Sequence, residues 1–572
     1  MIRHLLKKNK LGKASSFVEA DEIFLDSKNL PGFDRQQFEG RIEKPISKRA
    51  VIFLGIMFTI IIGSFSVRLG YLQIEKGEAY YKRSENNVLE KDIIFADRGI
   101  IYDRNRVELA WNKKTEGSVE TPEGERTFPI RAYRTGGFSH VLGYVAYPAK
   151  DKSGNFWQSE FTGKDGLEKI YDLHVKGENG LKILETDAQG NLHSENIVNA
   201  PKRGADLVTT IDSRIQGEMF KLIQDLSEAH SFTGGAGVIM DVHSGEIIAS
   251  TSFPEYDSEV LSLGKESAKI KHYLTDKRKA LLDRTMSGLY TPGSIVKPFF
   301  ALGALNEKII DPAKQILSTG SISIPNPYSP GDKTVFKDWK AHGWVDMRHA
   351  IAVSSDVYFY EIGGGFEGQK GLGIARLEQY AKLFHIGEKT GVDLPDEKEG
   401  VIPSPEWKAK VFPGDPWRIG NTYHTSIGQY GFQVTPLQMT RATAAIANSG
   451  TLPTPHFVLG DIEKESQQVK IELPEEYFVI VREGMRMTVT EGTAAALNMP
   501  YVKAAAKTGT AQLGVAKNRV NSWIIGYFPY DNPKYAFTVM MESGPSTGSV
   551  GASSIMRGLF EWMSVHTPEY FQ

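Results

Sequence analysis

The sequence predicts an α+β fold for the large C-terminal part of the chain, in which one antiparallel sheet is built from both ends and helices lie between. The first observation is that residues 234–253 hold two apolar runs on either side of DVHSGE, a pattern typical of a β-hairpin. The second is that two further strand-like runs in residues 521–542 meet at PYDNPK, before a helical pattern that starts at about Ser549. Most segments between these two hairpins have helical patterns.

Composition excludes several functional classes. The chain has 572 residues, which is enough for several domains, and its net charge of -2 gives no indication of a nucleic-acid-binding protein. It contains no cysteine, which excludes disulfides, thiol nucleophiles and cysteine-ligated metals. The absence of cysteine is compatible with an oxidising compartment.

The first element is a membrane anchor. Ala50–Val67 is uncharged and has about the length needed to cross a bilayer, and Lys48 and Arg49 stand directly before it. This charge asymmetry places the N-terminal side in the cytoplasm and everything after the span outside. A buried core helix is the alternative, and a cleaved signal peptide is disfavoured by the length of the preceding tail. We expect a cytoplasmic tail at 1–49 and a transmembrane helix at 50–72.

Two regions follow the anchor. Residues 73–207 are rich in glycine and charge and contain short alternating runs, which indicates a mostly β region whose fold periodicity does not specify. The sequence pattern changes in GADLVTTIDSRIQGEMFKLIQDL, where a strand-like run leads into an amphipathic helical pattern. We therefore expect a β-rich pedestal domain at 73–207 and a second domain at 208–572.

The stretch LYTPGSIVKPFFALGAL, residues 289–305, predicts a buried helix that begins at about Ser294. Pro298 is tolerated only in the first turn of such a helix. Lys297 is the one charged side chain in it, and burying an ammonium group is costly unless it is paired or loses its proton. A serine three residues before a lysine lies on the same helical face. The alternative is a capping serine and a lysine that reaches the surface.

Two later motifs complete a pattern that S-x-x-K alone does not specify, since SLGK at Ser262–Lys265 also matches it. SSD occurs at Ser354–Asp356 and KTGT at Lys507–Thr510, in the order S-x-x-K, S-x-D/N, K-T-G that marks penicillin-recognising serine enzymes. A competing KTG at Lys389–Gly391 runs into a charged loop. Lys507 instead lies in a strand of small residues, where Gly509 would let a substrate backbone approach closely.

With these motifs the chain resembles a class B penicillin-binding protein, a peptidoglycan transpeptidase. RGIIYDRNRVELA (Arg98–Ala110) resembles the family's pedestal motif, although Arg106 stands where a glycine is usual, which puts the local turn in doubt. GKDGLEKIYD, YTPGSIVKP and NTYHTSIGQYGFQVTPLQM also resemble family blocks. SSDVYFY, with Asp356 where division-type relatives carry asparagine, resembles the elongation-type members.

The resemblance implies a role for each motif residue. Ser294 would attack the D-Ala-D-Ala carbonyl of a stem peptide, and Lys297, beside Asp356, would act as its base, which requires a lysine able to lose its charge. Ser354 would relay the proton to the leaving amine. The terminal carboxylate would be held by Lys507, Thr508 and Thr510. Gly509 would let the substrate backbone approach this strand closely. The backbone N–H groups of Ser294 and Thr510 would form the oxyanion hole, and β-lactams would acylate the same serine.

The resemblance also implies location and partners. It places the protein in the bacterial cytoplasmic membrane as a single-pass protein, with its catalytic domain on the periplasmic side. Partners would be stem peptides, a separate RodA-like membrane glycosyltransferase and other elongation-complex proteins. Some relatives use a cysteine to bind zinc, so no metal is expected here, nor any cofactor. Two alternatives are a membrane-bound β-lactam sensor, although no H-E-x-x-H protease motif occurs, and a catalytically idle scaffold.

Overall fold

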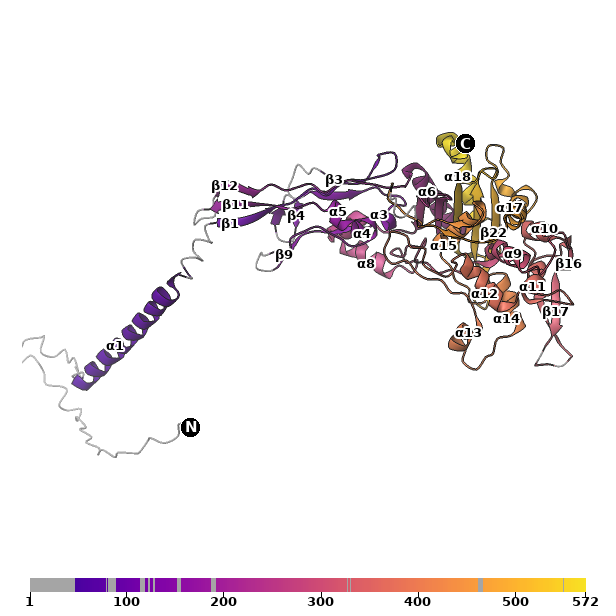
Figure 1. Cartoon of the computed structure of the whole chain (residues 1–572). Helices are drawn as coiled ribbons and strands as arrows, with labels where there is room; N and C mark the ends of the chain where they lie inside the picture. Colours follow the sequence, from indigo (N-terminus) through magenta and orange to yellow (C-terminus); the bar gives the residue numbers. More distant parts are fainter. Residues whose placement is uncertain are drawn as a thin grey trace, which may run out of the picture. The chain divides into compact units, whose positions relative to one another are not determined.

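Two compact units, Met1–Leu89 and Glu90–Gln572, make up the chain (Figure 1). The computed structural model describes residues 47–78, 80, 89–113, 119–121, 124–126, 129–151, 156–186, 192–326, 328–329, 331–460, 467–548 and 550–572. The expected tail at 1–49 therefore lies outside the described residues except for its last three positions.

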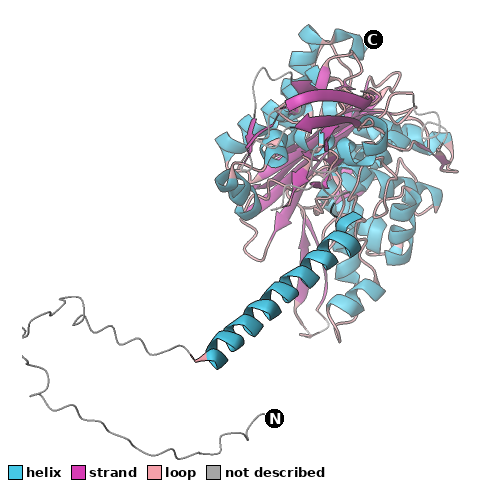
Figure 2. Cartoon of the chain, turned by 90° about the vertical axis from the view of Figure 1, so that its left-hand side faces the viewer, coloured by secondary structure: helices cyan, strands magenta, loops and turns pink. Residues whose placement is uncertain are grey.

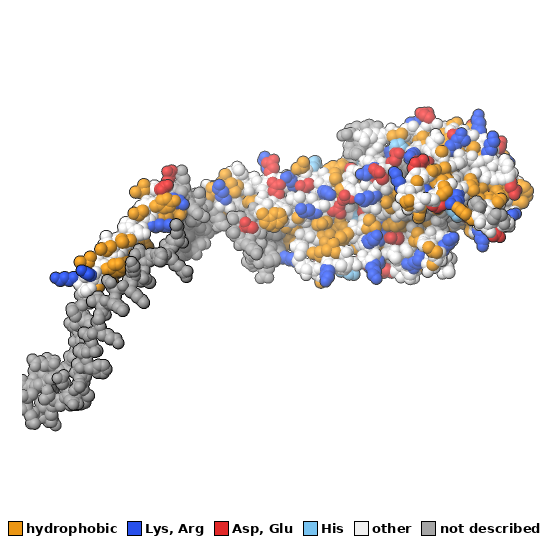
Figure 3. Space-filling model, turned by 90° about the horizontal axis from the view of Figure 1, so that it is seen from below, with side chains coloured by type: hydrophobic (Ala, Val, Ile, Leu, Met, Phe, Trp, Pro, Cys, Tyr) orange, Lys and Arg blue, Asp and Glu red, His pale blue; other side chains and the backbone are white. Residues whose placement is uncertain are grey.

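The N-terminal unit contains one long apolar helix, α1 (Lys48–Gly70), which continues as a π-helical turn at Tyr71–Glu75. Ser47 caps it by accepting a hydrogen bond from the Ala50 N–H. None of its residues is buried, and Figure 3 shows apolar side chains exposed along it. Within the described residues it is the only helix long and apolar enough to cross a membrane. The expected long apolar helix at the N-terminal end is confirmed.

The pedestal region is built from short strands. A four-stranded sheet has the order β13-β2-β3-β6, in which β13 lies parallel to β2, and a three-stranded sheet has the order β1-β11-β12. Short helices α3 (Ser139–Leu142), α4 (Gly166–Ile170) and α5 (Asp172–Val175) complete it. The strands are β1 (Leu89–Ile94), β2 (Ile101–Tyr102), β3 (Glu108–Lys113), β4 (Val119–Thr121), β5 (Gly124–Arg126), β6 (Ile130–Tyr133), β7 (Val145–Ala146), β8 (Ala149–Lys150), β9 (Phe156–Gln158), β10 (Thr162–Gly163), β11 (Gly180–Thr186), β12 (Leu192–Asn199) and β13 (Leu207–Val208).

The turn between β2 and β3 has Arg106 where the sequence comparison led us to expect a glycine. Arg106 adopts a left-handed backbone with φ +62°. Asp103 holds the turn, because its Oδ1 accepts hydrogen bonds from the N–H groups of Asn105 (2.7 Å) and Val107 (2.8 Å). The turn therefore forms with an arginine at this position, and the left-handed backbone of Arg106 is strained.

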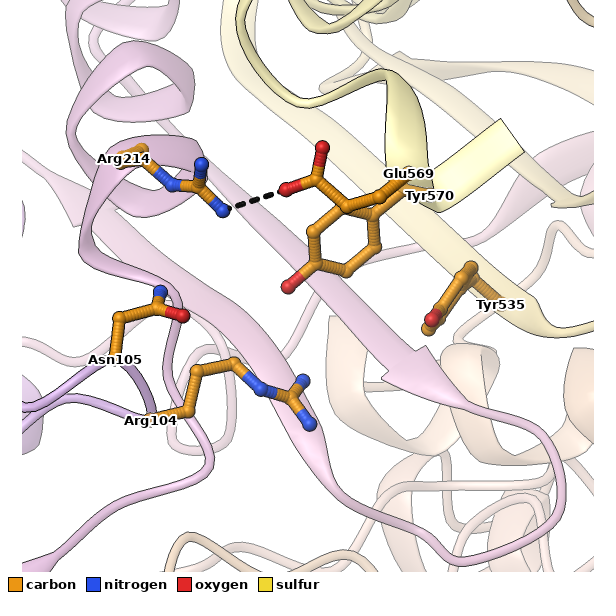
Figure 4. A pocket seen from close by; sticks show the side chains of 6 residues that line it. All are labelled: Arg104, Asn105, Arg214, Tyr535, Glu569 and Tyr570. Carbon is orange, nitrogen blue, oxygen red and sulfur yellow. Dashed lines mark hydrogen bonds and ion pairs between the residues drawn. The ribbon is translucent and has the colours of Figure 1, made fainter. Parts of the chain in front are cut away.

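This turn also joins the pedestal to the start of α6 (Ser213–His230). The second carboxylate oxygen of Asp103 accepts from the hydroxyl of Ser213 at 2.6 Å. A polar pocket of about 240 Å³ lies at this junction (Figure 4). It is lined by Arg104, Asn105, Arg214, Tyr535, Glu569 and Tyr570. The guanidinium groups in this pocket are paired, Arg104 with Glu246 and Arg214 with Glu569 and Asp212. These ion pairs link segments that are far apart in the sequence.

The C-terminal region contains a five-stranded sheet of order β15-β14-β24-β23-β22, with antiparallel neighbours throughout. Its strands are β14 (Gly234–Asp241), β15 (Ile247–Phe253), β22 (Ala505–Leu513), β23 (Arg519–Phe528) and β24 (Tyr535–Pro545). Both expected hairpins are confirmed, and β22, which carries Lys507, is an edge strand. The α+β class expected from the sequence is confirmed.

Helices cover both faces of this sheet, and Figure 2 shows helices on several sides of the strands. On one face α6 and α18 (Ala552–His566) pack side by side around Met219, Ile223 and Phe560. On the other face α15 (Pro436–Ala447) lies across β24, β14 and β23, and α17 (Glu475–Thr490) lies against β22. The last helix begins three residues later than the expected Ser549, a residue outside the described set.

The inserted block carries the remaining elements. Its helices are α7 (Ser258–Leu263), α8 (Ser267–Thr275), α9 (Lys297–Asn306), α10 (Met347–Ala352), α11 (Asp356–Gly364), α12 (Gly373–Leu383), α13 (Pro405–Val411) and α14 (Ile419–Ser426). Its strands, with the short β20–β21 pair, are β16 (Ile316–Ser318), β17 (Ser321–Pro325), β18 (Lys333–Lys337), β19 (Gly343–Val345), β20 (Thr451–Leu452) and β21 (Val469–Lys470). Short 3₁₀ turns occur at Ala495–Leu497 and Pro568–Phe571.

The helix expected to begin at Ser294 begins differently. Gly293–Val296 form a 3₁₀ turn, and the α-helix α9 starts at Lys297. Pro298 has no N–H to donate to the Ser294 carbonyl, so the Lys297 N–H donates there instead, which gives the tighter turn. Burial of α9 from Lys297 to Leu305 is as expected.

Candidate active site

The segment just before Ser294 is held by two hydrogen bonds to its backbone. The Gly293 N–H donates to the Gly428 carbonyl at 2.9 Å, and the Trp523 indole N–H donates to the Thr291 carbonyl at 3.0 Å. A Cβ at Gly428 would lie 2.1 Å from the Gly293 carbonyl oxygen, so only glycine permits this approach. Ser294 itself stays partly exposed on this fixed turn.

Lys297 is fully buried and paired. Its ammonium donates to Asp356 Oδ1 at 2.6 Å, to the Ser354 carbonyl at 2.8 Å and to the Ser354 hydroxyl at 3.3 Å. It also lies 5.3 Å from the Phe359 ring centre. The alternative of a lysine that reaches the surface is therefore wrong, and the 3₁₀ turn has no side-chain cap, so Ser294 is not a capping serine. Asp356 compensates the burial of the charge.

Ser354 lies at the meeting point of two lysines. It sits between α10 and α11 with a left-handed φ of +59°. Its hydroxyl oxygen accepts from Lys507 Nζ at 2.8 Å as well as from Lys297. Ammonium groups only donate, so the hydroxyl proton of Ser354 is left to be given to a third group.

Lys507 is the second buried ammonium of the site. It donates to the Ser354 hydroxyl and, at 2.7 Å, to the Thr508 carbonyl. Burial, followed by the positive charge of Lys297, lowers the pKa of Lys507 well below its usual value, while Asp356 opposes this shift. One carboxylate thus lies near two buried lysines, and the lowered pKa favours the neutral form of Lys507.

The edge strand β22 passes directly beside the nucleophile turn. A Cβ at Gly509 would lie 2.8 Å from Ile295 Cγ2 and 2.9 Å from the Pro292 carbonyl oxygen, so this close passage needs glycine. Thr510 is exposed, and Thr508 is partly exposed. An edge strand offers unpaired backbone groups to an extended peptide. The structure brings together all eight residues that the motifs pointed to: Ser294, Lys297, Ser354, Asp356, Lys507, Thr508, Gly509 and Thr510.

The competing motifs have other environments. Ser262 is buried in α7, where its hydroxyl accepts from the Val145 N–H at 3.2 Å. Thr390, beside Lys389, bonds through its hydroxyl to Glu397 at 2.6 Å in a loop. Neither segment contacts the lysines of the site. Over the described part of the chain, no group of three or more His, Asp or Glu side chains is placed to hold a metal ion.

Sequence reasoning missed one polar neighbour of the site. The Thr493 hydroxyl lies 2.5 Å from that of Thr508. Thr493 follows α17 in TEGTAA, a stretch without a catalytic spacing signal, and its partner is 15 residues away along the chain. Only the folded contact between the two segments identifies it.

Two family models match this chain. Residues 235–561 match the penicillin binding protein transpeptidase domain, and residues 124–209 match the penicillin-binding protein dimerisation domain. The first match covers more than half of the chain.

Named relatives and solved structures resemble the chain over most of its length. Peptidoglycan D,D-transpeptidase MrdA of Acinetobacter baumannii is 32% identical over 454 residues, which cover 74% of this chain and 64% of that protein. The MrdA protein of Escherichia coli is 26% identical over 90% of this chain and 94% of its own. The penicillin-binding protein PBP2 of Helicobacter pylori, solved with MreC, has a TM-score of 0.67 at 27% identity, over 84% of this chain and 99% of its own. A chain from a peptidoglycan synthase complex, in a structure that describes the coordination of polymerization and crosslinking, has a TM-score of 0.67 at 26% identity. The match covers 89% of this chain and 97% of that chain.

Proposed function

The chain belongs to the penicillin-binding protein transpeptidase family, and we propose that it is a peptidoglycan D,D-transpeptidase in which Ser294 carries the acyl group. The recognition of this family from the sequence motifs is confirmed by the family match and by the MrdA relatives. The observation that carries the assignment of roles is the convergence of Lys297 and Lys507 on the Ser354 hydroxyl beside the Ser294 turn.

Acylation begins at Ser294. Its oxygen attacks the carbonyl of the penultimate D-Ala, and its proton passes to Lys297, which acts as the base in the neutral form after release of its own proton to solvent. The new C–O bond forms as the C–N bond to the terminal D-Ala breaks. Ser354 donates its proton to the leaving amine and recovers one from Lys297, whose Nζ lies 3.3 Å from its hydroxyl, so that Lys297 is neutral again. A second stem-peptide amine then attacks the ester, or water does so in a carboxypeptidase reaction. Asp356 holds Lys297 in place throughout.

Two backbone N–H groups stabilise the tetrahedral oxyanion, those of Ser294 and Thr510. The contact between their segments supports this role, because a Cβ at Gly293 would lie 3.0 Å from the Thr510 carbonyl oxygen. Ser294 is in the first turn of its helix, where N–H groups lack helical partners. Each such donor typically contributes about 3–4 kcal/mol to the transition state.

The terminal carboxylate of the stem peptide binds along β22. The hydroxyls of Thr508 and Thr510 lie on one side of this edge strand and donate to the anion, while Gly509 keeps the strand close to Ser294. The arriving negative charge favours the protonated form of Lys507, whose pKa is lowered in the free site by burial. A β-lactam with a carboxylate in the same place acylates the same serine.

Topology and partners follow from the anchor. We place the N-terminus in the cytoplasm and residues after 72 outside, with the pedestal at 73–207 and the transpeptidase domain at 208–572. A cross-linking enzyme needs new glycan strands, so a RodA-like membrane polymerase is the proposed partner. The likeness to a chain from a synthase complex that joins polymerization to crosslinking supports it, and that to PBP2 bound to MreC supports other elongation-complex partners. Replacing Ala50–Val67 by an unrelated apolar span, with loss of polymerase co-purification expected, tests whether the helix makes this contact.

The test of the function uses the full-length protein in bilayers with glycan strands that carry pentapeptides. Release of D-Ala and formation of cross-linked peptide dimers by the wild type, and neither by Ser294→Ala, is the expected result. A β-lactam sensor would be acylated by penicillin without releasing D-Ala, and an idle scaffold would do neither. Either outcome in the wild-type protein contradicts the proposal.

A further inference from the structure

Thr493 belongs to a turn that is pinned to the second catalytic motif. Its backbone N–H donates to the Ala352 carbonyl at 3.1 Å. A Cβ at the preceding Gly492 would lie 2.2 Å from that same carbonyl oxygen, so the turn fits closely against α10. Ala352 ends α10, two residues before Ser354. The position of Thr493 is therefore fixed relative to the Ser354 hydroxyl.

The side chain of Thr493 reaches the third motif. Its hydroxyl oxygen lies 2.5 Å from the Thr508 hydroxyl oxygen, within hydrogen-bond distance, and both hydroxyls are accessible to solvent. Thr508 follows Lys507, whose ammonium bonds to Ser354. Thr493 thus spans from the end of α10 to the strand that carries the carboxylate-binding threonines.

A hydroxyl has one proton to donate and lone pairs that accept. When Thr508 donates its proton to an anion, its oxygen can still accept from Thr493, and such a chain of hydrogen bonds strengthens the terminal bond to the anion. Without Thr493 the Thr508 hydroxyl is free to rotate away from the anion. We infer that Thr493 is a positioning residue that orients the Thr508 hydroxyl toward the carboxylate of the stem peptide or β-lactam. This inference rests on the proposed function.

A purely structural role would look different. If Thr493 only held the turn after α17, its hydroxyl would affect folding and all acylating ligands alike. Thr490 offers a matched control, because it lies three residues earlier and its hydroxyl bonds within α17 to the Arg486 carbonyl at 3.4 Å. Thr493→Val removes the hydroxyl and keeps the branched side chain. Thr493→Ser restores the hydroxyl.

The experiment compares second-order acylation rates by benzylpenicillin and by its methyl ester, in which the carboxylate is neutralised. For the wild type, the ratio of the two rates measures recognition of the carboxylate. Thr493→Val is expected to lower this ratio about tenfold, the effect of one charge-assisted hydrogen bond, with little change in the ester rate. Thr493→Ser is expected to retain the ratio, and so is Thr490→Val.

A ratio that is unchanged in Thr493→Val, or equal losses for acid and ester, overturns the inference. If Thr493→Val does not fold, a wild-type-like ratio in Thr493→Ala overturns it instead. Failure of the proposed function would give a different result: neither benzylpenicillin nor its methyl ester would acylate Ser294 in the wild-type protein.

Discussion

The Asp356 carboxylate accepts a hydrogen bond from the buried Lys297 ammonium at 2.6 Å, inside a site that holds a second buried ammonium but no further carboxylate bonded to either lysine among the described residues. The site therefore has two basic side chains and one carboxylate, and the electrostatic stabilisation of both lysines depends on Asp356. That dependence is open to measurement.

Replacing Asp356 by asparagine removes the carboxylate that opposes the lowered pKa of Lys507. With Asp356→Asn the pKa of Lys507 should fall further, because no negative charge then favours its charged form. The basic limb of the pH profile of penicillin acylation, where Lys507 loses its charge, should therefore move toward lower pH, by roughly one pH unit. A basic limb at an unchanged pH would contradict the assigned coupling.

Replacing Lys507 by alanine should cripple acylation. The variant loses the cation beside Ser354 and Thr508, and we expect a fall in the second-order acylation rate of about 100-fold or more. Lys389→Ala is the control, because Lys389 lies in the competing KTG and makes no contact with the site. Comparable losses in the two variants would assign the third motif to the wrong sequence.

Arg106 predicts a stabilising change in the pedestal. Its φ of +62° costs an ordinary L-residue about 1–2 kcal/mol, which exceeds the roughly 0.4–1 kcal/mol that glycine loses through its freer unfolded chain. Arg106→Gly should therefore raise the melting temperature, and Arg106→Ala, which keeps the Cβ, should not. The comparison is made by calorimetry, and equal melting temperatures for the two variants would show that the backbone is not strained there.

Glu361, on α11, predicts a pH-dependent contribution to stability. Burial, followed by the nearby Glu367, raises the pKa of Glu361 to about 7. A carboxyl group whose pKa is raised on folding favours the folded state at low pH, and this contribution is lost as the pH rises through about 7. Glu361→Gln should raise the melting temperature at pH 8, on the order of 2–4 °C, and much less at pH 4. A rise of the same size at both pH values would assign the effect to something other than ionisation.

The hairpins and the catalytic motifs were predictable because each is a local signal. DVHSGE and PYDNPK mark turns between apolar runs, and the local context of Ser294 and Lys507, an apolar helix and a strand of small residues, favours them over the competing motifs. The pedestal strands were not predictable, since several have only two residues and pair across long separations, as β13 does with β2. The 3₁₀ start of α9 could have been foreseen from the missing N–H of Pro298.

Covalent labelling tests the central claim most directly. The full-length protein is treated with benzylpenicillin, digested, and examined by mass spectrometry for the residue that carries the penicilloyl group, beside Ser294→Ala and Ser262→Ala. The account predicts one adduct on Ser294 in the wild type and in Ser262→Ala, and none in Ser294→Ala. An adduct on another residue, or labelling that persists in Ser294→Ala, would contradict it.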